Sequence, residues 1–371
     1  MPHPAAAAIP PERTGRKGLP VTLAAGLLGY GHGATELVCS CTLTRVLDAT
    51  DLAAGAVLWF NLLAFVSQPP VGWIVDRLGR PHRFLLLSAP LLAAGLAVSP
   101  WWPGAAIGLL GVGNCLYHVI AGASSLRLSG GTAAPLGLMV GPGAIGVSLG
   151  IGLARLPAAY AFGGCAIALL LGLGVGLVGG PAEEADKVGR ADREADTRVR
   201  FAPLALLLLC VAARALAGAG LGFEWDTSAG TAIALAVGAV LGKIGGGFAA
   251  DRMGWLRFCL VALGLGVPAL WGGQTFAVLG WCGALLFQAP MAVTLGGIGQ
   301  ALPGRPALAF GLASTAVYAG TLLPSRGVAA VMHSAAGLSG VALATALLLA
   351  LGLAGGRHAP APVAGTREES H

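Results

Sequence analysis

The chain has 371 residues, of which 56% are hydrophobic and only 10% are charged, and its mean hydropathy is +0.80. A soluble domain carries about 25% charged residues, because water has to solvate most of its surface. This composition therefore excludes a soluble protein and predicts an all-α polytopic membrane protein, since the apolar runs are about twice as long as the roughly ten-residue spans of a β-barrel. The net charge of +6 does not indicate nucleic-acid binding, because the basic residues are scattered over short loops.

Twelve apolar runs of about 20 residues, separated by charges, prolines or glycine-rich turns, predict twelve transmembrane helices. The first six are expected at 20–44, 52–75, 83–99, 103–126, 133–154 and 157–179, and the second six at 202–222, 228–250, 256–272, 275–299, 306–330 and 337–355. The predicted parts of the chain are an N-terminal tail (1–19), a six-helix bundle (20–180), a charged linker (181–200), a second six-helix bundle (201–356) and a C-terminal tail (357–371). A cleaved signal peptide at 13–35 is the disfavoured alternative, because that segment contains His32 and Glu36 and lacks a convincing cleavage site.

The basic residues give the orientation, because Lys and Arg accumulate on the cytoplasmic side of a membrane. With the N-terminus inside, 17 of the 22 Lys and Arg residues fall on inner segments, and only Arg45 and Arg155 fall on outer ones. Both chain termini and the linker are therefore expected in the cytoplasm. The seven cysteines are spread over several spans, which predicts apolar packing rather than a disulfide framework.

The pattern G-x-x-x-D-R-x-G occurs twice, 175 residues apart, each time at the expected cytoplasmic end of the second helix of a six-helix half. Its glycines allow close helix contact, its aspartates can accept hydrogen bonds from a neighbouring helix N-terminus, and its arginines can meet helix C-terminal carbonyls. We expect these loops to hold the cytoplasmic ends of the bundles together in one state and release them in another, although they could serve only as turn and topology residues. The residues of this predicted gate are Gly72, Asp76, Arg77, Gly79, Arg80, Gly247, Asp251 and Arg252.

The repeated pattern resembles the loop signature of the major facilitator superfamily, which implies two six-helix bundles related by an axis along the membrane normal. Three segments, 60–72, 111–118 and 302–305, are similar to the fosmidomycin-resistance branch, which implies proton-driven export of small drugs. The chain departs from that branch at Val119-Ile120, where the branch tends to have a proline and an acidic residue. The run Gly137-x-x-x-Gly141-Pro142-x-x-x-Gly146 also resembles the antiporter signature of drug exporters.

Charged side chains inside the predicted spans are functional candidates, because each costs about 3 kcal/mol or more near the centre of a membrane. His32 and Glu36 are four residues apart and share one face of the first span. We expect Glu36, helped by His32, to carry the coupling proton. The alternative is that the pair only hydrogen-bonds to adjacent helices.

Arg214, near the middle of the seventh span, and Lys243, in the eighth, make the interior of the second bundle basic. A guanidinium suits a carboxylate or phosphonate, so Arg214 is predicted to face the substrate cavity. The alternatives are a fixed ion pair between Arg214 and Glu36 and, for Lys243, snorkelling to the membrane surface. Further predicted cavity residues are Asn61, Asn114, His118, Gln288 and Tyr30, for which bonding or packing between helices is the alternative. Arg155 and Arg326, at outer helix ends, are predicted to anchor helices rather than to attract anions.

The sequence as a whole predicts a secondary active transporter that moves a small organic, anionic solute by alternating access, with proton-coupled efflux as the favoured mode. An importer of a metabolite or ion on the same fold and a transport-inactive assembly factor or receptor are the alternatives. The chain contains no G-x-x-x-x-G-K-[ST] run, so ATP is not expected to supply the energy. We expect no enzyme activity, no cofactor and no metal, and a monomer in the plasma (inner) membrane whose partners are the lipid bilayer, a small-molecule substrate and protons.

Overall fold

The computed structural model describes residues 20–50, 53–78, 81–177, 198–322 and 326–355, and all structural statements concern these residues. The terminal tails, most of the charged linker and the two predicted gate residues Gly79 and Arg80 lie outside them. The described chain is helical throughout, without strands. The all-α architecture expected from the composition is therefore confirmed.

The N-terminal half contains the first six predicted spans. Four of them are single helices: α1 (Val21–Ala49), α4 (Pro81–Val98), α5 (Pro103–Ser129) and α8 (Ala158–Leu177). The second span consists of α2 (Ala53–Asn61), the π-helix η1 (Leu62–Val66) and α3 (Gln68–Leu78), and the fifth consists of α6 (Ala134–Val140) and α7 (Gly143–Ala154). The break between α6 and α7 falls at Gly141-Pro142, because proline has no N–H to donate and its ring clashes with the preceding turn.

The C-terminal half contains the other six spans. Its uninterrupted helices are α10 (Phe201–Gly220), α11 (Ala229–Met253), α12 (Trp255–Gly272) and α17 (Ala335–Ala354), while the tenth span is α13 (Ala277–Gln288) followed by α14 (Met291–Ala301). The eleventh span, expected at 306–330, is shorter than predicted. Its helix α15 (Pro306–Thr321) ends before Pro324, which disfavours a continuous helix, and a separate short helix follows, α16 (Arg326–Met332).

Length and apolar character identify the segments that can cross a membrane. Among the described residues, eight helices are long and apolar enough to do so when consecutive helical pieces are joined. Two further apolar helices, Phe84–Val98 and Ala158–Gly172, are shorter. Each of the twelve predicted spans contains at least one helix of the structure. The chain is therefore a polytopic membrane protein.

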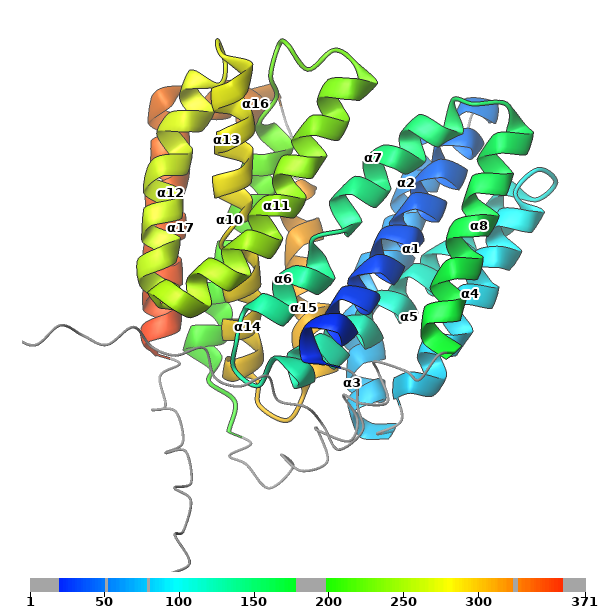
Figure 1. Ribbon diagram of the computed structural model, residues 1–371, viewed down its shortest axis with the longest axis horizontal. Coiled ribbons are helices and arrows are strands. Elements are labelled where there is room, and N and C mark those ends of the chain that lie inside the picture. Colours follow the sequence, from blue (N-terminus) through cyan, green and yellow to red (C-terminus); the bar gives the residue numbers. More distant parts are fainter. Residues whose placement is uncertain (1–19, 51–52, 79–80, 178–197, 323–325, 356–371) are drawn as a thin grey trace, which may run out of the picture.

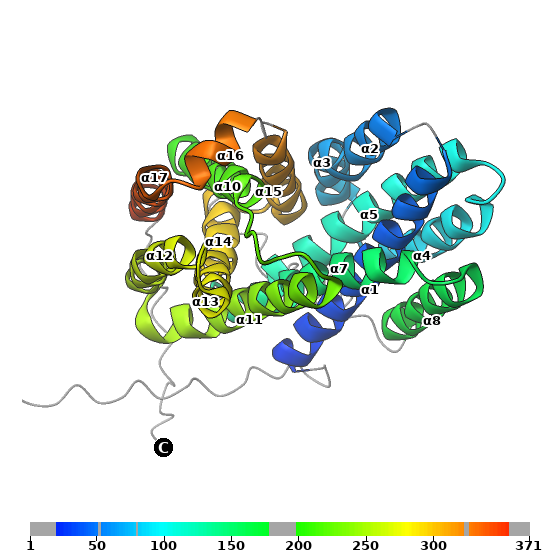
Figure 2. The ribbon, with the colours of Figure 1, turned by 90° about the horizontal axis from the view of Figure 1, so that it is seen from above.

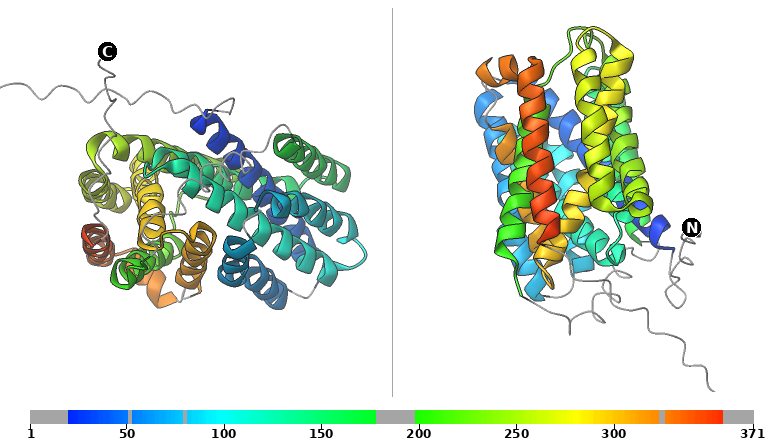
Figure 3. Two further views of the ribbon diagram at one scale, coloured as in Figure 1. Left: turned by 90° about the horizontal axis from the view of Figure 1, so that it is seen from below. Right: turned by 90° about the vertical axis from the view of Figure 1, so that its left-hand side faces the viewer.

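The helices form two bundles that lie side by side, α1–α8 and α10–α17 (Figures 1 and 2). A side view of the C-terminal bundle shows its long helices running roughly along one axis (Figure 3). Between the bundles, α3 packs against α15, and α6 and α7 pack against α11. The largest buried apolar cluster contains residues of both bundles, among them Leu28, Leu136, Leu207 and Ile298. The two bundles therefore share part of one core.

The first glycine of each copy of the repeated pattern lies at a close approach between the bundles. A Cβ atom on Gly72 would lie 2.4 Å from the carbonyl oxygen of Ala307 on α15. A Cβ atom on Gly247 would lie 2.8 Å from the carbonyl oxygen of Ala133, immediately before α6. Both contacts are backbone contacts, so any larger residue at either position pushes the bundles apart.

Candidate functional site

The side chains of His32 and Glu36 on α1 and of His118 on α5 meet, and we call these three residues the triad. His118 Nε2 lies 2.9 Å from His32 Nε2 and 3.1 Å from Glu36 Oε1, whereas His32 Nε2 and Glu36 Oε1 are 4.0 Å apart. Each side chain is largely buried, with between 6% and 13% of its surface exposed. The sequence pattern paired His32 with Glu36, and the structure adds His118, 86 residues beyond His32, as the group that contacts both.

The other nitrogen of each imidazole fixes where its hydrogen lies. His32 Nδ1 is 3.0 Å from the carbonyl oxygen of Met139, and His118 Nδ1 is 2.9 Å from the carbonyl oxygen of Asn114. A carbonyl oxygen can only accept, so each Nδ1 carries a hydrogen, and the Nε2 of the neutral ring presents a lone pair. Two Nε2 lone pairs and a carboxylate oxygen therefore converge, and none of these three side chains offers a donor to the other two. Such acceptors repel one another unless a proton or another cation lies among them.

Neighbouring residues hold the triad in place. A Cβ atom on Gly143, the first residue of α7, would lie 2.4 Å from His32 Cε1, so this glycine and the preceding helix break leave the space that the imidazole fills. Asn114 donates from Nδ2 to Glu36 Oε1 over 3.3 Å. The rings of Phe65 on η1 and Phe310 on α15 lie 6.3 and 6.5 Å from the ring of His118. Because Phe310 belongs to the C-terminal bundle, the triad borders the interface between the bundles.

Arg214 on α10 is a buried cation with incomplete hydrogen bonding. Only 6% of the residue is exposed, and its Nη2 donates to the carbonyl oxygen of Phe287 over 2.5 Å. Its Nε and Nη1 are buried and have no hydrogen-bond partner within the described part of the chain. The ion pair with Glu36 that the sequence left open is not formed in this conformation, because the polar contacts of Glu36 are with the triad histidines and Asn114.

Lys243 lies in the interior of α11 rather than near its end. It lies ten positions before Met253, which corresponds to about 15 Å of helix. The positive charge of Lys243 is repelled by Arg214 and attracted by Glu36. A Cβ atom on Gly137 of α6 would lie 2.4 Å from the carbonyl oxygen of Lys243, so α11 meets the N-terminal bundle at this point. This position favours an interior role over snorkelling.

The remaining predicted cavity residues are dispersed. Gln288 is half-buried at the end of α13, directly after the residue that accepts from Arg214. Asn61 is half-buried where α2 meets η1, and Tyr30 on α1 is 39% exposed. Among the described contacts, neither Asn61 nor Tyr30 touches the triad.

The aspartates of the repeated pattern each cap a helix of the opposite bundle. The carboxylate of Asp76 accepts hydrogen bonds at the start of α15, and that of Asp251 accepts them at the start of α6. The four donors, at 2.7–3.1 Å, are the backbone N–H groups of Ala307 and Leu308 for Asp76 and of Ala133 and Ala134 for Asp251. These groups have no partner inside their own helices and lie at the positive end of the helix dipole. We call the four hydrogen bonds the latch.

Two residues that the sequence did not single out support the latch. Arg127 Nη2 lies 3.8 Å from Asp76 Oδ1, and Trp255 donates from Nε1 to Asp251 Oδ1 over 3.0 Å. The arginines of the repeated pattern were expected at helix C-terminal carbonyls. Instead, the guanidinium of Arg77 lies 3.6 Å from the ring centroid of Trp73, and Arg252 is exposed. The neighbouring aromatic ring provides Arg77 with a cation–π partner on its own helix.

At the opposite helix ends, Arg45 makes the carbonyl contacts expected of an anchor. Its Nη1 donates to the carbonyl oxygens of Ala154 and Leu156 at the end of α7, over 2.9 and 3.1 Å. Arg155 follows directly after α7 and is exposed, and the side chain of Arg326 is not among those described. Whether Arg155 and Arg326 act as anchors therefore stays a prediction.

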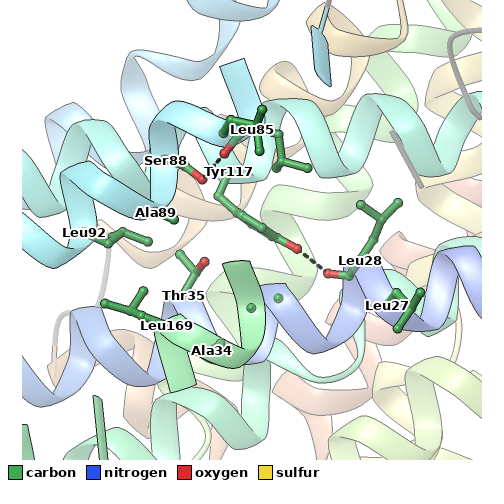
Figure 4. A pocket seen from close by; sticks show the side chains of 13 residues that line it. Leu27, Leu28, Ala34, Thr35, Leu85, Ser88, Ala89, Leu92, Tyr117 and Leu169 are labelled. Atoms are coloured by element: carbon green, nitrogen blue, oxygen red, sulfur yellow. Dashed lines mark hydrogen bonds between the residues drawn. The ribbon is translucent and has the colours of Figure 1, made fainter. Parts of the chain in front are cut away.

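A separate apolar pocket lies inside the N-terminal bundle, between α1, α4, α5 and α8 (Figure 4). Six of its thirteen lining residues are leucines, among them Leu85 and Leu169. Tyr117 projects into the pocket and donates its hydroxyl hydrogen to the carbonyl oxygen of Leu28 over 2.6 Å (Figure 4). None of the triad residues lines this pocket, so it is distinct from the candidate site.

Solved structures of transporters share this architecture. A structure of the transporter FucP in the outward conformation has a TM-score of 0.62 and 15% identity, with 91% of this chain and 98% of that chain covered. The chain has the major facilitator superfamily fold. A bacterial homologue of the iron transporter ferroportin, in an outward-facing state, gives a TM-score of 0.57 at 17% identity, covering 90% and 98% of the two chains. The proton:xylose symporter XylE gives 0.55 at 15% identity, covering 91% and 94%.

These likenesses establish the fold and no more, because every identity is below 20%. The fold is that of transporters rather than of enzymes. No protein-family model matches the chain, and no curated protein is similar to it in sequence. The roles of the triad, Arg214 and the latch therefore have to be argued from their own geometry.

Proposed function

We propose that the protein is a proton-coupled secondary transporter that moves a small organic anion by alternating access, with export as the favoured direction. The observation that carries this proposal is the convergence of three hydrogen-bond acceptors at the triad, which calls for a bound cation beside the bundle interface. A proton on His118 satisfies all three acceptors, because its Nε2–H then lies within reach of both His32 Nε2 and Glu36 Oε1.

Loss of this proton supplies the coupling step. Without it the two lone pairs and the carboxylate charge repel one another in a largely water-free environment, so the triad residues separate. Separation of α1 from α5 disturbs the contact between His118 and Phe310 of the opposite bundle. The protonation state of the triad can thereby favour one arrangement of the bundles over another.

An anionic substrate is supported by the charges of the C-terminal bundle. Arg214 has two unsatisfied donor groups, Nε and Nη1, and the positive charge of Lys243 acts on the same region. A carboxylate or phosphonate would satisfy the two donors of the guanidinium and compensate the buried charge. Gln288, next to the carbonyl acceptor of Arg214, can add a neutral hydrogen bond.

The latch is proposed to be the cytoplasmic gate, formed in this conformation and released in the other. The predicted excess of basic residues on the same side supports that orientation in a plasma (inner) membrane, with both termini cytoplasmic. Export is supported by the resemblance of several segments to drug exporters. Import remains the second candidate, because FucP and XylE, which have the same fold, are proton symporters.

Flux measurements on reconstituted protein test the proposal. Small carboxylates and phosphonates are added one at a time to liposomes that contain the protein and a pH-sensitive dye. A transported compound should produce proton flux. Inverting the proton gradient and recording the sign of the flux gives the direction of transport. Glu36→Gln removes the carboxylate charge and should reduce this flux by about tenfold or more, the equivalent of 1.4 kcal/mol. Glu224→Gln, at an exposed loop position, is the matched control and should transport normally. Normal proton flux in Glu36→Gln would overturn the coupling assignment.

A further inference from the structure

We infer that the triad is also a binding site for one divalent first-row transition-metal ion, held by His32 Nε2, His118 Nε2 and Glu36 Oε1. These three atoms all lie within 4.8 Å of one another. Two imidazole nitrogens and one carboxylate oxygen suit Zn²⁺, Fe²⁺ or Co²⁺, whereas Mg²⁺ and Ca²⁺ prefer oxygen ligands alone. The sequence pattern does not indicate such a site, because the third ligand is distant in the chain.

The distances between the three atoms fit a single ion. Their separations are 2.9, 3.1 and 4.0 Å, and the circle through three points so placed has a radius of about 2.0 Å. That radius equals the usual distance from Zn²⁺ to histidine nitrogen or carboxylate oxygen, about 2.0–2.2 Å. An ion at the centre of the circle would therefore reach all three ligands without rearrangement. The ligands would form a T and leave further coordination positions open, unlike the closed four-ligand shell of a structural zinc site.

The surroundings of the triad are those of a metal site. Each histidine donates its Nδ1 hydrogen to a backbone carbonyl oxygen, that of Met139 for His32 and that of Asn114 for His118. Such bonds fix the tautomer that exposes Nε2 and orient the ring toward a metal. The side chain of Asn114 likewise orients the carboxylate of Glu36.

The nearby charges limit the site to one weakly held ion. Lys243 on α11 acts on both His32 and Glu36, so its positive charge opposes a second cation. Cys39, one turn beyond Glu36 on α1, faces the side chain of Asn114 rather than the triad nitrogens. Because the inference uses the same three acceptors as the proposed proton site, the metal ion and the proton exclude one another there.

Titration with Co²⁺ tests the inference on the full-length protein in detergent, purified without a metal-affinity tag. The visible absorption of bound Co²⁺ should saturate at one ion per chain, and Zn²⁺ but not Mg²⁺ should displace it. His118→Gln and Glu36→Gln each remove one ligand and should abolish saturable binding. Asn114→Ala, which removes only the support of the carboxylate, should weaken binding by about tenfold. His333→Gln, at an exposed histidine, is the matched control and should bind as the native chain does.

X-ray absorption of Co²⁺ bound to the native protein adds a measurement that depends on no variant, and it should show two imidazole ligands. Absence of saturable binding, native affinity in His118→Gln, or a spectrum without imidazole would each overturn the inference. Proton flux measured in metal-free buffer separates the two proposals. If the protein shows proton flux that depends on Glu36 but binds no Co²⁺, only the transport proposal is supported. If it binds Co²⁺ but shows no such flux, only the metal site is supported.

Discussion

At the scale of single residues, buried polar groups in both bundles lack hydrogen-bond partners. The three triad side chains offer one another acceptors but no donor, and Nε and Nη1 of Arg214 are donors without an acceptor in the described part of the chain. Buried polar groups are normally paired, because leaving one unsatisfied costs about 1–3 kcal/mol. A cation bound at the triad and an anion bound at Arg214 would supply the missing partners, as the transport proposal requires.

The unsatisfied guanidinium leads to a prediction about stability. Arg214→Met keeps an unbranched apolar stem and removes the unpaired charge, so it should raise the melting temperature of the substrate-free protein by a few degrees, equivalent to about 1–3 kcal/mol. The same variant should lose any thermal stabilisation by small carboxylates or phosphonates. Both quantities are measured by thermal unfolding in detergent.

Arg45→Met is the matched control for this prediction. The guanidinium of Arg45 already donates to two carbonyl oxygens, so its removal should lower the melting temperature and leave anion stabilisation intact. If Arg214→Met is destabilised as much as Arg45→Met, the guanidinium of Arg214 is a structural group and the anion argument fails.

At the scale of elements, two interrupted helices provide irregular backbone next to the triad. The π-helix η1 disturbs the regular hydrogen-bond ladder, and the carbonyl oxygen of Phe65 within it accepts a hydrogen bond from Thr315 of the opposite bundle over 2.8 Å. The break at Gly141-Pro142 begins α7 at Gly143, directly against the ring of His32. Both interruptions lie beside the triad, where a continuous helix would not leave the same space.

A single added methyl group tests the importance of the second break. In Gly143→Ala the new Cβ would lie 2.4 Å from His32 Cε1, so the imidazole has to leave its position in the triad. We expect the proton flux of Gly143→Ala in liposomes to be lower than the native flux by about tenfold or more, the equivalent of 1.4 kcal/mol. The control is Gly152→Ala on the same helix, where no atom lies within 4 Å of the new Cβ, and it should keep native flux. Equal flux in the two variants would show that the position of His32 is unimportant for coupling.

The latch connects the two bundles reciprocally at the scale of the whole molecule. An aspartate from the first bundle caps α15 of the second, and an aspartate from the second caps α6 of the first. The glycines one turn earlier on α3 and α11 bring the backbones close enough for these contacts. All four hydrogen bonds are made between bundles, so a rigid-body rotation of one bundle breaks them together.

Weakening both halves of the latch should shift the conformational equilibrium. Asp76→Asn with Asp251→Asn removes two charges from helix N-termini, at about 1 kcal/mol each, which together correspond to roughly a thirtyfold shift toward the state with the latch open. Spin labels at Leu78 and Met253, exposed positions at the ends of α3 and α11, should report a longer distance in this variant.

Spin labels at Leu78 and Leu171, both on the N-terminal bundle, provide the control and should report an unchanged distance. An unchanged distance between Leu78 and Met253 in the double variant would mean that the aspartates serve only to cap their helices.

The sequence by itself determined the membrane class, the all-α architecture and the repeated pattern, because these depend on local composition and on spacing along the chain. A span must be apolar over about 20 residues wherever it lies, and proline interrupts a helix whatever surrounds it. The capping role of Asp76 and Asp251 was predictable for the same reason, since a carboxylate beside a helix N-terminus has one favourable use. Which helices receive the caps was not contained in that pattern.

Only the tertiary structure decided which polar groups meet. His118 joins His32 and Glu36 because α5 packs against α1, and Arg127 reaches Asp76 because α5 packs against α3. Arg214 faces Phe287 rather than Glu36 for the same reason, as α10 presents it to the C-terminal bundle. Contacts between helices arise from the three-dimensional packing of residues far apart in the chain, and helical periodicity specifies only the face of each helix on which a residue lies.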